Sequence, residues 1–202
     1  LLPMDRDAFE NAYVGSFAQY NADVISPQDL LTALMGATDS MIENQEKTAV
    51  NEVRFYEHFK SYMDADTFAA IDAKLDHYYS VEFDVVKAVT SQSQAMVDSV
   101  AYLKESGKQL ILATNPLFPK VATDKRIAWS GVDLTDFMDV TRFEENHFCK
   151  PQLQYYTEIL EDHGLKAEEC LMVGNDVEED LIARELGMKT MLLTDDLIYR
   201  NT

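Results

Sequence analysis

The chain has 202 residues, of which 47% are hydrophobic and 26% charged, a composition typical of a folded globular protein. Its formal net charge of −19 argues against binding to nucleic acid or to an anionic membrane, because both partners require clustered lysine and arginine. Cys149 and Cys170 lack the spacing of a disulfide framework, no apolar run is long enough for a membrane span, and the first residues carry no signal-peptide pattern. We expect a cytoplasmic monomer or homodimer with free thiols that binds neither nucleic acid nor membrane.

The first part of the chain, residues 5–83, carries almost no strand signals and favours helices. Ser26 before Pro27 is a residue type that caps a helix N-terminus, and Asp64 or Asp66 could cap the last helix. Aromatic and apolar residues recur at three- and four-residue spacing, as at Phe55, Phe59 and Phe68, which predicts a small helical bundle with its own core. The predicted helices are 7–20, 27–37, 51–63 and 64–80, with loop character over 35–47.

After about residue 90 the pattern changes to alternating helices and strands. The predicted order is helix 91–106, strand 109–113, helix 119–129, strand 138–141, helix 152–163, strand 170–173, helix 178–186 and strand 189–193. Such alternation predicts an α/β fold, a Rossmann-like doubly wound parallel sheet with helices on both faces. Ligands on such sheets bind at the carboxyl ends of strands, where Thr114 and Asp176 fall.

The segment 171–180 is the most informative part of the sequence. An apolar strand stops at Gly174 and Asn175 and releases Asp176 and Asp180, which would lie one helical turn apart on one face. Two carboxylates at the end of a buried strand are costly unless a cation compensates them, and carboxylate oxygens suit Mg²⁺. The alternative is that both acids only favour a helix N-terminus, where the helix dipole stabilises negative charge.

Two further segments place polar groups near the same edge of the sheet. Thr114 and Asn115 follow an apolar strand and could cradle a phosphoryl oxygen. Pro151 fits the first position of a helix, which would hold Lys150 at the helix start beside the pocket. Lys47, in a polar stretch before a predicted helix, could bind a polar group of the substrate, although a solvated helix end is the alternative.

Thr114, Lys150 and the pair Asp176 and Asp180, in this order and spacing, resemble motifs II, III and IV of the haloacid dehalogenase-like (HAD) hydrolase superfamily. The resemblance covers residues 90–196 directly, and the helical segment resembles the family's C1-type cap. It implies an all-helical cap over residues 5–88 and an α/β core formed by residues 1–4 and 89–202.

The resemblance also implies an activity, a Mg²⁺-dependent phosphatase that hydrolyses a small soluble phosphorylated metabolite through an aspartyl-phosphate intermediate. Asp176 would then bind the metal, and Asp180 would orient metal-bound waters or Lys150. Thr114, the Asn115 backbone amide and Lys150 would stabilise the phosphoryl oxygens. A phosphomutase, a phosphonatase and a catalytically inactive binding protein of the same fold are the alternatives.

One family motif is absent from the sequence. Motif I, Asp-x-Asp-x-Thr, supplies the nucleophile and the general acid/base, and no such pattern occurs here. The chain opens with Leu1-Leu2-Pro3-Met4-Asp5, which looks like what commonly follows Asp-Gly-Thr in these proteins. We therefore expect about ten upstream residues, one strand and its turn, to carry both aspartates.

Overall fold

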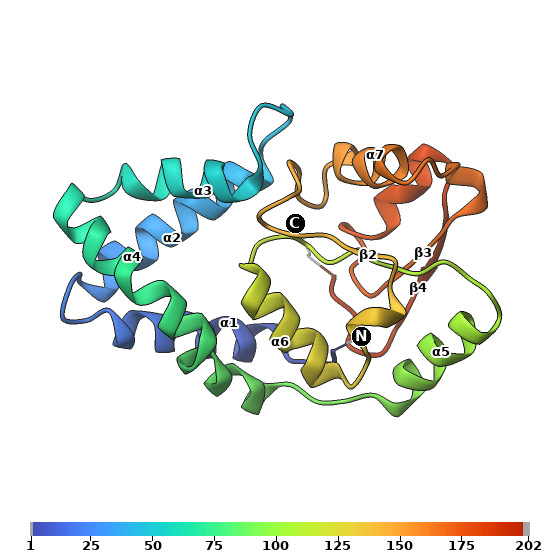
Figure 1. The fold of residues 1–202 in the computed structure, drawn as a ribbon, viewed down its shortest axis with the longest axis horizontal. Helices are drawn as coiled ribbons and strands as arrows, with labels where there is room; N and C mark the ends of the chain where they lie inside the picture. The colour runs from blue at the N-terminus through green and yellow to red at the C-terminus, as the bar shows by residue number, and fades with distance from the viewer. Residues whose placement is uncertain (1, 200–202) are drawn as a thin grey trace.

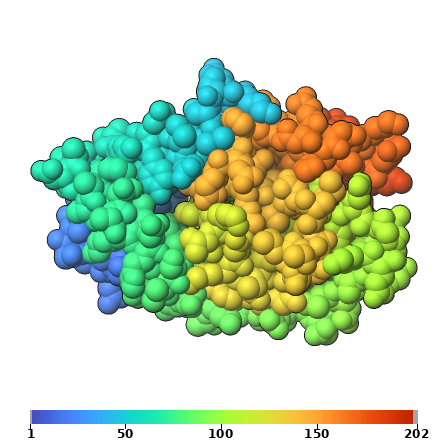
Figure 2. Space-filling view, viewed as in Figure 1, coloured from blue at the N-terminus to red at the C-terminus, as the bar shows by residue number. Residues whose placement is uncertain are grey.

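The computed structural model describes residues 2–199 and divides into a helical part and an α/β part (Figure 1). The helical part holds α1 to α4, and the α/β part holds the strands together with α5, α6 and α7. In the space-filling view the cyan segment that follows α2 lies against the orange segment that precedes α7 (Figure 2). Leu1 and residues 200–202, which the sequence-based division assigns to the core, lie outside the described residues.

The helices of the first part begin where local sequence signals place them. Ser26 Oγ accepts a hydrogen bond from Asp29 N at 3.1 Å, which confirms Ser26 as an N-cap, and Asp64 Oδ1 accepts one from Thr67 N at 2.8 Å, so Asp64 and not Asp66 caps α4. Aromatic side chains, with Tyr78 and Phe83 fully buried, fill the interior of this part. The elements are α1 (Arg6–Tyr20), α2 (Pro27–Ile42), α3 (Asn51–Lys60), α4 (Ala65–Ser80) and the 3-10 helix η1 (Glu82–Val89).

The predicted loop over 35–47 is wrong for its first half, because α2 continues to Ile42. Gly36, which suggested the loop, lies inside this helix. A Cβ atom at Gly36 would lie 2.0 Å from the Tyr62 hydroxyl oxygen. The glycine therefore lets another segment approach the helix closely and does not mark a turn.

The α/β part contains parallel strand pairs, in agreement with the predicted α/β class. Within residues 2–199, β1 pairs with β2 and β3 pairs with β4, both in parallel, as two separate two-stranded sheets. The helices are α5 (Gln94–Glu105), α6 (Lys120–Ser130) and α7 (Leu153–Asp162), with the 3-10 turns η2 (Leu134–Asp136), η3 (Ala167–Glu169) and η4 (Leu181–Leu186). The strands are β1 (Ile111–Leu112), β2 (Asp139–Val140), β3 (Leu171–Gly174) and β4 (Lys189–Leu192).

Two linkers join the parts and run side by side. Met4 forms an antiparallel bridge with Thr90, and Ser91 N donates to Pro3 O at 2.9 Å. The chain therefore enters and leaves the helical part at one place. Among the described residues no helix is long and apolar enough to cross a membrane.

Arg126 on α6 is a cation without a carboxylate partner among residues 2–199. Its Cζ atom lies 5.0 Å from the ring centre of Phe9 and 5.2 Å from that of Phe118. Its Nε atom is buried and makes no hydrogen bond within the same residues. Burial lowers the pKa of Arg126 to about 10, because an apolar surrounding disfavours the charged form.

We expect Arg126→Met to raise the free energy of unfolding by about 1 kcal/mol at pH 7, because the desolvation cost of the guanidinium disappears while its packing remains. Since the pKa is lower in the folded than in the unfolded chain, this cost is complete below about pH 10 and shrinks above it. Urea denaturation of both proteins at pH 7 measures the difference. A less stable variant would mean that the guanidinium interactions with the two rings outweigh the desolvation cost.

Candidate functional site

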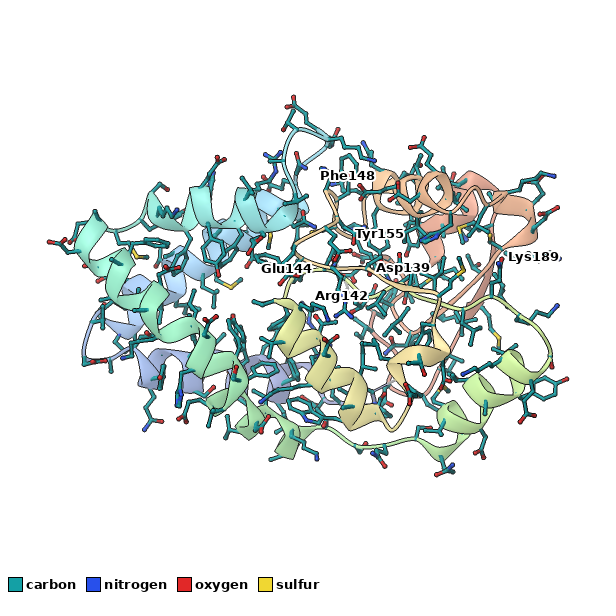
Figure 3. All side chains as sticks on the ribbon, in the orientation of Figure 1. Asp139, Arg142, Glu144, Phe148, Tyr155 and Lys189 are labelled. Atoms are coloured by element: carbon teal, nitrogen blue, oxygen red, sulfur yellow. The ribbon has the colours of Figure 1, made fainter. Side chains whose placement is uncertain are left out.

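Five of the six predicted site residues, all except Lys47, lie in the loops at the carboxyl ends of β1 and β3 and before α7. Thr114 lies two residues after β1, and Asp176 lies two residues after β3. Lys150 comes from the loop between β2 and α7, near which Figure 3 labels Phe148 and Tyr155. The Thr114 hydroxyl makes no hydrogen bond to any residue within 2–199, so it is available to a ligand.

The turn after β3 is built from side-chain hydrogen bonds. Asp176 Oδ1 accepts from Glu178 N and Glu179 N, both at 2.9 Å. Asp180 Oδ2 accepts from Asp176 N at 3.0 Å, and Asp180 N donates to Asp176 O at 3.0 Å. Asp176 and Asp180 are thus adjacent, and both are about 95% buried.

The predicted helix over 178–186 is wrong in type and in its start. Only the 3-10 helix η4, Leu181–Leu186, forms there. Asp176 Oδ1 accepts from Glu178 N and Glu179 N as a helix N-cap does. After Asp180 the hydrogen bonding spans three residues, as from Ala183 N to Asp180 O at 3.4 Å, so the segment forms a 3-10 helix and not an α-helix.

Gly174 allows Asp180 to fold back over the end of β3. A Cβ atom at position 174 would lie 1.9 Å from Asp180 Oδ2 and 2.2 Å from its Cγ. The glycine is therefore required by the close approach of a carboxylate to the backbone, not by a left-handed conformation.

Lys150 and Asp180 form a buried ion pair. Lys150 Nζ lies 2.6 Å from Asp180 Oδ1, and the two side chains are 6% and 7% exposed. Both Asp180 oxygens are thereby engaged, one by the ammonium group and one by the Asp176 amide. Asp180 thus holds Lys150 beside Asp176 at the end of β3.

The backbone of Lys150 is held by the side chain of Asn115. Asn115 Oδ1 accepts from Lys150 N at 3.1 Å, and Asn115 Nδ2 donates to Lys150 O at 3.4 Å. The prediction that Pro151 starts the helix is wrong, because α7 begins at Leu153 with Gln152 as its N-cap and the Lys150–Pro151 peptide is cis. Lys150 is thus positioned by a neighbouring loop and not by a helix start.

Two tyrosines of α7, which the sequence analysis did not identify, connect the loops of the site. Tyr155 Oη donates to Thr114 O at 2.8 Å, and Tyr156 Oη donates to Glu179 O at 2.6 Å. Lys150 Nζ lies 5.6 and 5.9 Å from the two ring centres. Burial raises the pKa of both phenols, so both remain donors. Their place on the predicted helix 152–163 was the only available signal.

Lys47 contacts a different residue from those that surround Lys150 and Asp176. Its Nζ atom is 3.4 Å from Oε1 of Glu158, a buried residue of α7 that also accepts hydrogen bonds from His147 N and Asn146 Nδ2. Within the described residues, Lys47 therefore connects the helical part to the α/β part and does not contact the other predicted site residues.

Residues on both sides of Lys47 form hydrogen bonds to the loop of the α/β part that precedes Lys150. Asn44 Nδ2 donates to His147 O at 2.9 Å, and Asn51 Nδ2 donates to Phe148 O at 3.3 Å. Asn51 N donates to Asn146 O at 2.8 Å. These bonds hold the loop after α2 against the loop that carries Lys150, so the two parts meet beside the site.

A separate cleft of about 700 Å³ lies between α3, α4 and α6. Glu144, at the boundary of the two parts in Figure 3, lines it together with Glu52 and Asp124. Its lysines, Lys120 and Lys125, are each paired with an aspartate. None of the predicted site residues lines this cleft, and its acidic side chains outnumber its lysines, which makes it unsuited to a phosphate.

The donor set at the end of β3 fits Mg²⁺ of the kind that keeps most of its waters. Among the described residues no group of three or more histidine, cysteine or acidic side chains could hold a metal. Mg²⁺ is commonly bound through one or two carboxylates with water and phosphate oxygens completing its shell. Asp176 is the carboxylate at this turn that would hold such an ion, and Asp180 is bonded to Lys150 and to the Asp176 amide.

The two cysteines are free thiols with different environments. Burial raises the pKa of the Cys149 thiol strongly, and burial together with Glu169 raises that of Cys170 less. Because the thiolate is the reactive form, we expect a disulfide reagent at pH 8 to modify Cys170 first and Cys149 only on unfolding. Mass spectrometry of the modified peptides measures the order. Equal rates in the native protein would contradict the buried position of Cys149.

Comparison with known proteins identifies relatives of this chain. A glyceraldehyde 3-phosphate phosphatase of Methanothermobacter thermautotrophicus is 29% identical over 121 residues, which are 59% of this chain and 50% of the relative. This chain thus spans about half the length of the curated relative that it matches.

Solved structures share the fold. A HAD-family enzyme of Bacteroides thetaiotaomicron, in complex with magnesium and inorganic phosphate, aligns with a TM-score of 0.55 at 15% identity, over 96% of this chain and 89% of that one. A predicted phosphoglycolate phosphatase of Haemophilus somnus aligns with a TM-score of 0.57 at 17% identity, over 96% and 81% of the two chains. The family model of haloacid dehalogenase-like hydrolases matches residues 6–187, and the chain belongs to this family.

Proposed function

We propose that this protein is a phosphatase that hydrolyses small phosphorylated metabolites. The observation that carries the proposal is the buried Lys150–Asp180 pair beside Asp176, at the strand ends where Thr114 also lies. A positive side chain, a hydroxyl and a metal-binding carboxylate are the groups that a phosphoryl transfer needs. The relatives named as phosphatases support the same activity.

The proposal gives each residue one task. Lys150 and the Thr114 hydroxyl, with the Asn115 main-chain amide, would bind the non-bridging phosphoryl oxygens and stabilise their charge in the transition state. Asp180 would keep the Lys150 ammonium group in place. Asp176 would hold Mg²⁺, which when bound supplies positive charge against the phosphate and the attacking carboxylate. Lys47 could bind a polar group of the substrate only if it left Glu158.

Covalent catalysis needs an aspartate that the described residues do not place at this site. We propose that an upstream segment provides it, as the family resemblance implies. Its carboxylate oxygen would form a bond to phosphorus while the ester oxygen leaves and takes a proton from a second acid. Water would then attack phosphorus, release inorganic phosphate and regenerate the carboxylate. Residues 5–88 would form the cap that covers this chemistry and selects the substrate.

The test is hydrolysis of para-nitrophenyl phosphate by the full-length protein, with Mg²⁺ and with EDTA. The panel also includes glyceraldehyde 3-phosphate and phosphoglycolate, because relatives carry these names. We expect metal-dependent turnover that falls at least about 100-fold in Asp176→Ala. The matched control is Asp66→Ala, an exposed acid of α4, which should retain full activity.

Absence of turnover on the whole panel by a folded protein would contradict the proposal. The remaining interpretation would then be a non-catalytic phosphate-binding protein of the same fold. Calorimetric titration with inorganic phosphate and Mg²⁺ would separate that interpretation from an inactive preparation, because only a folded site binds the anion.

A further inference from the structure

We infer that the side chain of Asn115 is a positioning residue for Lys150, and that its carboxamide does not bind the phosphate. The inference rests on the proposed function, in which Lys150 acts on the substrate. It concerns a different part of Asn115 from the main-chain amide, which remains available to a phosphoryl oxygen.

The geometry leaves the carboxamide no other task. Both of its polar atoms are directed at the backbone of one residue, since Oδ1 accepts from Lys150 N at 3.1 Å and Nδ2 donates to Lys150 O at 3.4 Å. These two bonds span 35 residues of sequence and connect the loop after β1 to the loop before α7. Asn115 thereby fixes the main chain of Lys150 relative to Thr114, its neighbour in sequence.

Lys150 needs such a support because nothing regular holds it. It lies outside any helix or strand, two residues before Gln152, the N-cap of α7. Its ammonium group must still reach Asp180 at 2.6 Å in a buried position. A backbone held at one end by Asn115 and a side chain held at the other by Asp180 define a single placement of the charge. Small displacements of such a group lower catalysis strongly.

The cap side adds a second reason why the clamp matters. Asn51 Nδ2 donates to Phe148 O, so the helical part holds the same loop two residues before Lys150. Any movement of the helical part would therefore pull on this loop. The two bonds from Asn115 separate Lys150 from that movement, because they belong to the α/β part.

The experiment compares Asn115→Ala with Asn21→Ala in the full-length protein. Asn21 is a matched control: it is fully buried, its Nδ2 donates to Phe17 O at 2.9 Å, and it lies at the end of α1. The first readout is acetylation of Lys150 by an N-hydroxysuccinimide ester, measured by mass spectrometry against the exposed Lys108. We expect Lys150 to react at least about fivefold faster in Asn115→Ala and at the wild-type rate in Asn21→Ala.

The second readout is steady-state hydrolysis of para-nitrophenyl phosphate. We expect Asn115→Ala to lower kcat by about 10–100-fold with little change in KM, because the transition-state contact is misplaced and not lost. In a Lys150→Met background the same change should lower kcat less than about threefold, since the group that Asn115 positions is gone.

The two readouts test the positioning role of Asn115 and the proposed phosphatase activity separately. Unchanged acetylation of Lys150 in Asn115→Ala, or an equal increase in Asn21→Ala, would overturn the inference whether or not the protein is a phosphatase. An equal loss of kcat in both backgrounds would also overturn it, because Asn115 would then act on the substrate independently of Lys150. A wild-type protein without turnover contradicts the proposed function, while the acetylation rates still decide whether Asn115 holds Lys150.

Discussion

Replacing Lys150 by methionine should inactivate the protein and destabilise it by about 3–5 kcal/mol. Asp180 would remain buried, about 95% of its surface hidden, without its cation, and removal of one partner of a buried pair typically costs this much. The loss of one charged group from the phosphoryl site should lower kcat by at least about 100-fold. Guanidinium denaturation and phosphatase assays measure the two effects separately.

The double variant Lys150→Met with Asp180→Asn separates charge from packing. Asparagine removes the buried charge but can still accept from Asp176 N, as Asp180 Oδ2 does at 3.0 Å. We expect it to recover at least about half of the lost stability and none of the lost activity. A single Lys150→Met variant as stable as the wild type would show that Asp180 reaches solvent or another donor.

Among the Gly→Ala substitutions in this chain, Gly174→Ala should cause the largest combined loss of stability and activity. The new Cβ atom would lie 1.9 Å from Asp180 Oδ2, so the Asp180 carboxylate must move away from Lys150 or β3 must shift. We expect a loss of about 1–3 kcal/mol in unfolding free energy. We also expect a fall in kcat of about 100-fold, because the charge at Lys150 is displaced. Denaturation curves and steady-state kinetics measure both.

Gly15→Ala provides the control of opposite sign. Gly15 lies inside α1, and a Cβ atom there would meet nothing within 4 Å. Alanine should therefore stabilise the protein by about 0.5–1 kcal/mol through helix propensity, without an effect on activity. If Gly174→Ala behaved like Gly15→Ala, the close contact between position 174 and Asp180 would be refuted.

The candidate site residues could be predicted from the sequence as a set, but their hydrogen-bond partners could not. Thr114, Lys150, Asp176 and Asp180 were selected by their positions at predicted element ends and by the resemblance of their order and spacing to the family motifs. The bonds of Asn115 to Lys150, across 35 residues, could not be predicted, because the path of the loops decides which atoms meet. The same is true of Lys47, whose contact with Glu158 depends on how the helical part lies on α7.

The sequence by itself determined the features that depend on interactions between residues close together in the chain. Ser26 and Asp64 cap their helices through bonds to amides three residues away, and glycines such as Gly131 end helices through their own positive φ. The alternation of helices and strands, and with it the α/β class and the edge where the site lies, follows from such local patterns.

Where a residue type is compatible with two local structures, only the tertiary structure decided which of them forms. Gly36 is a residue type typical of turns, but inside α2 it lets Tyr62 approach the helix closely. Pro151 fits a helix start but follows a lysine whose backbone a distant asparagine holds. In both cases the contacts join segments far apart in sequence, so they form only when the chain folds.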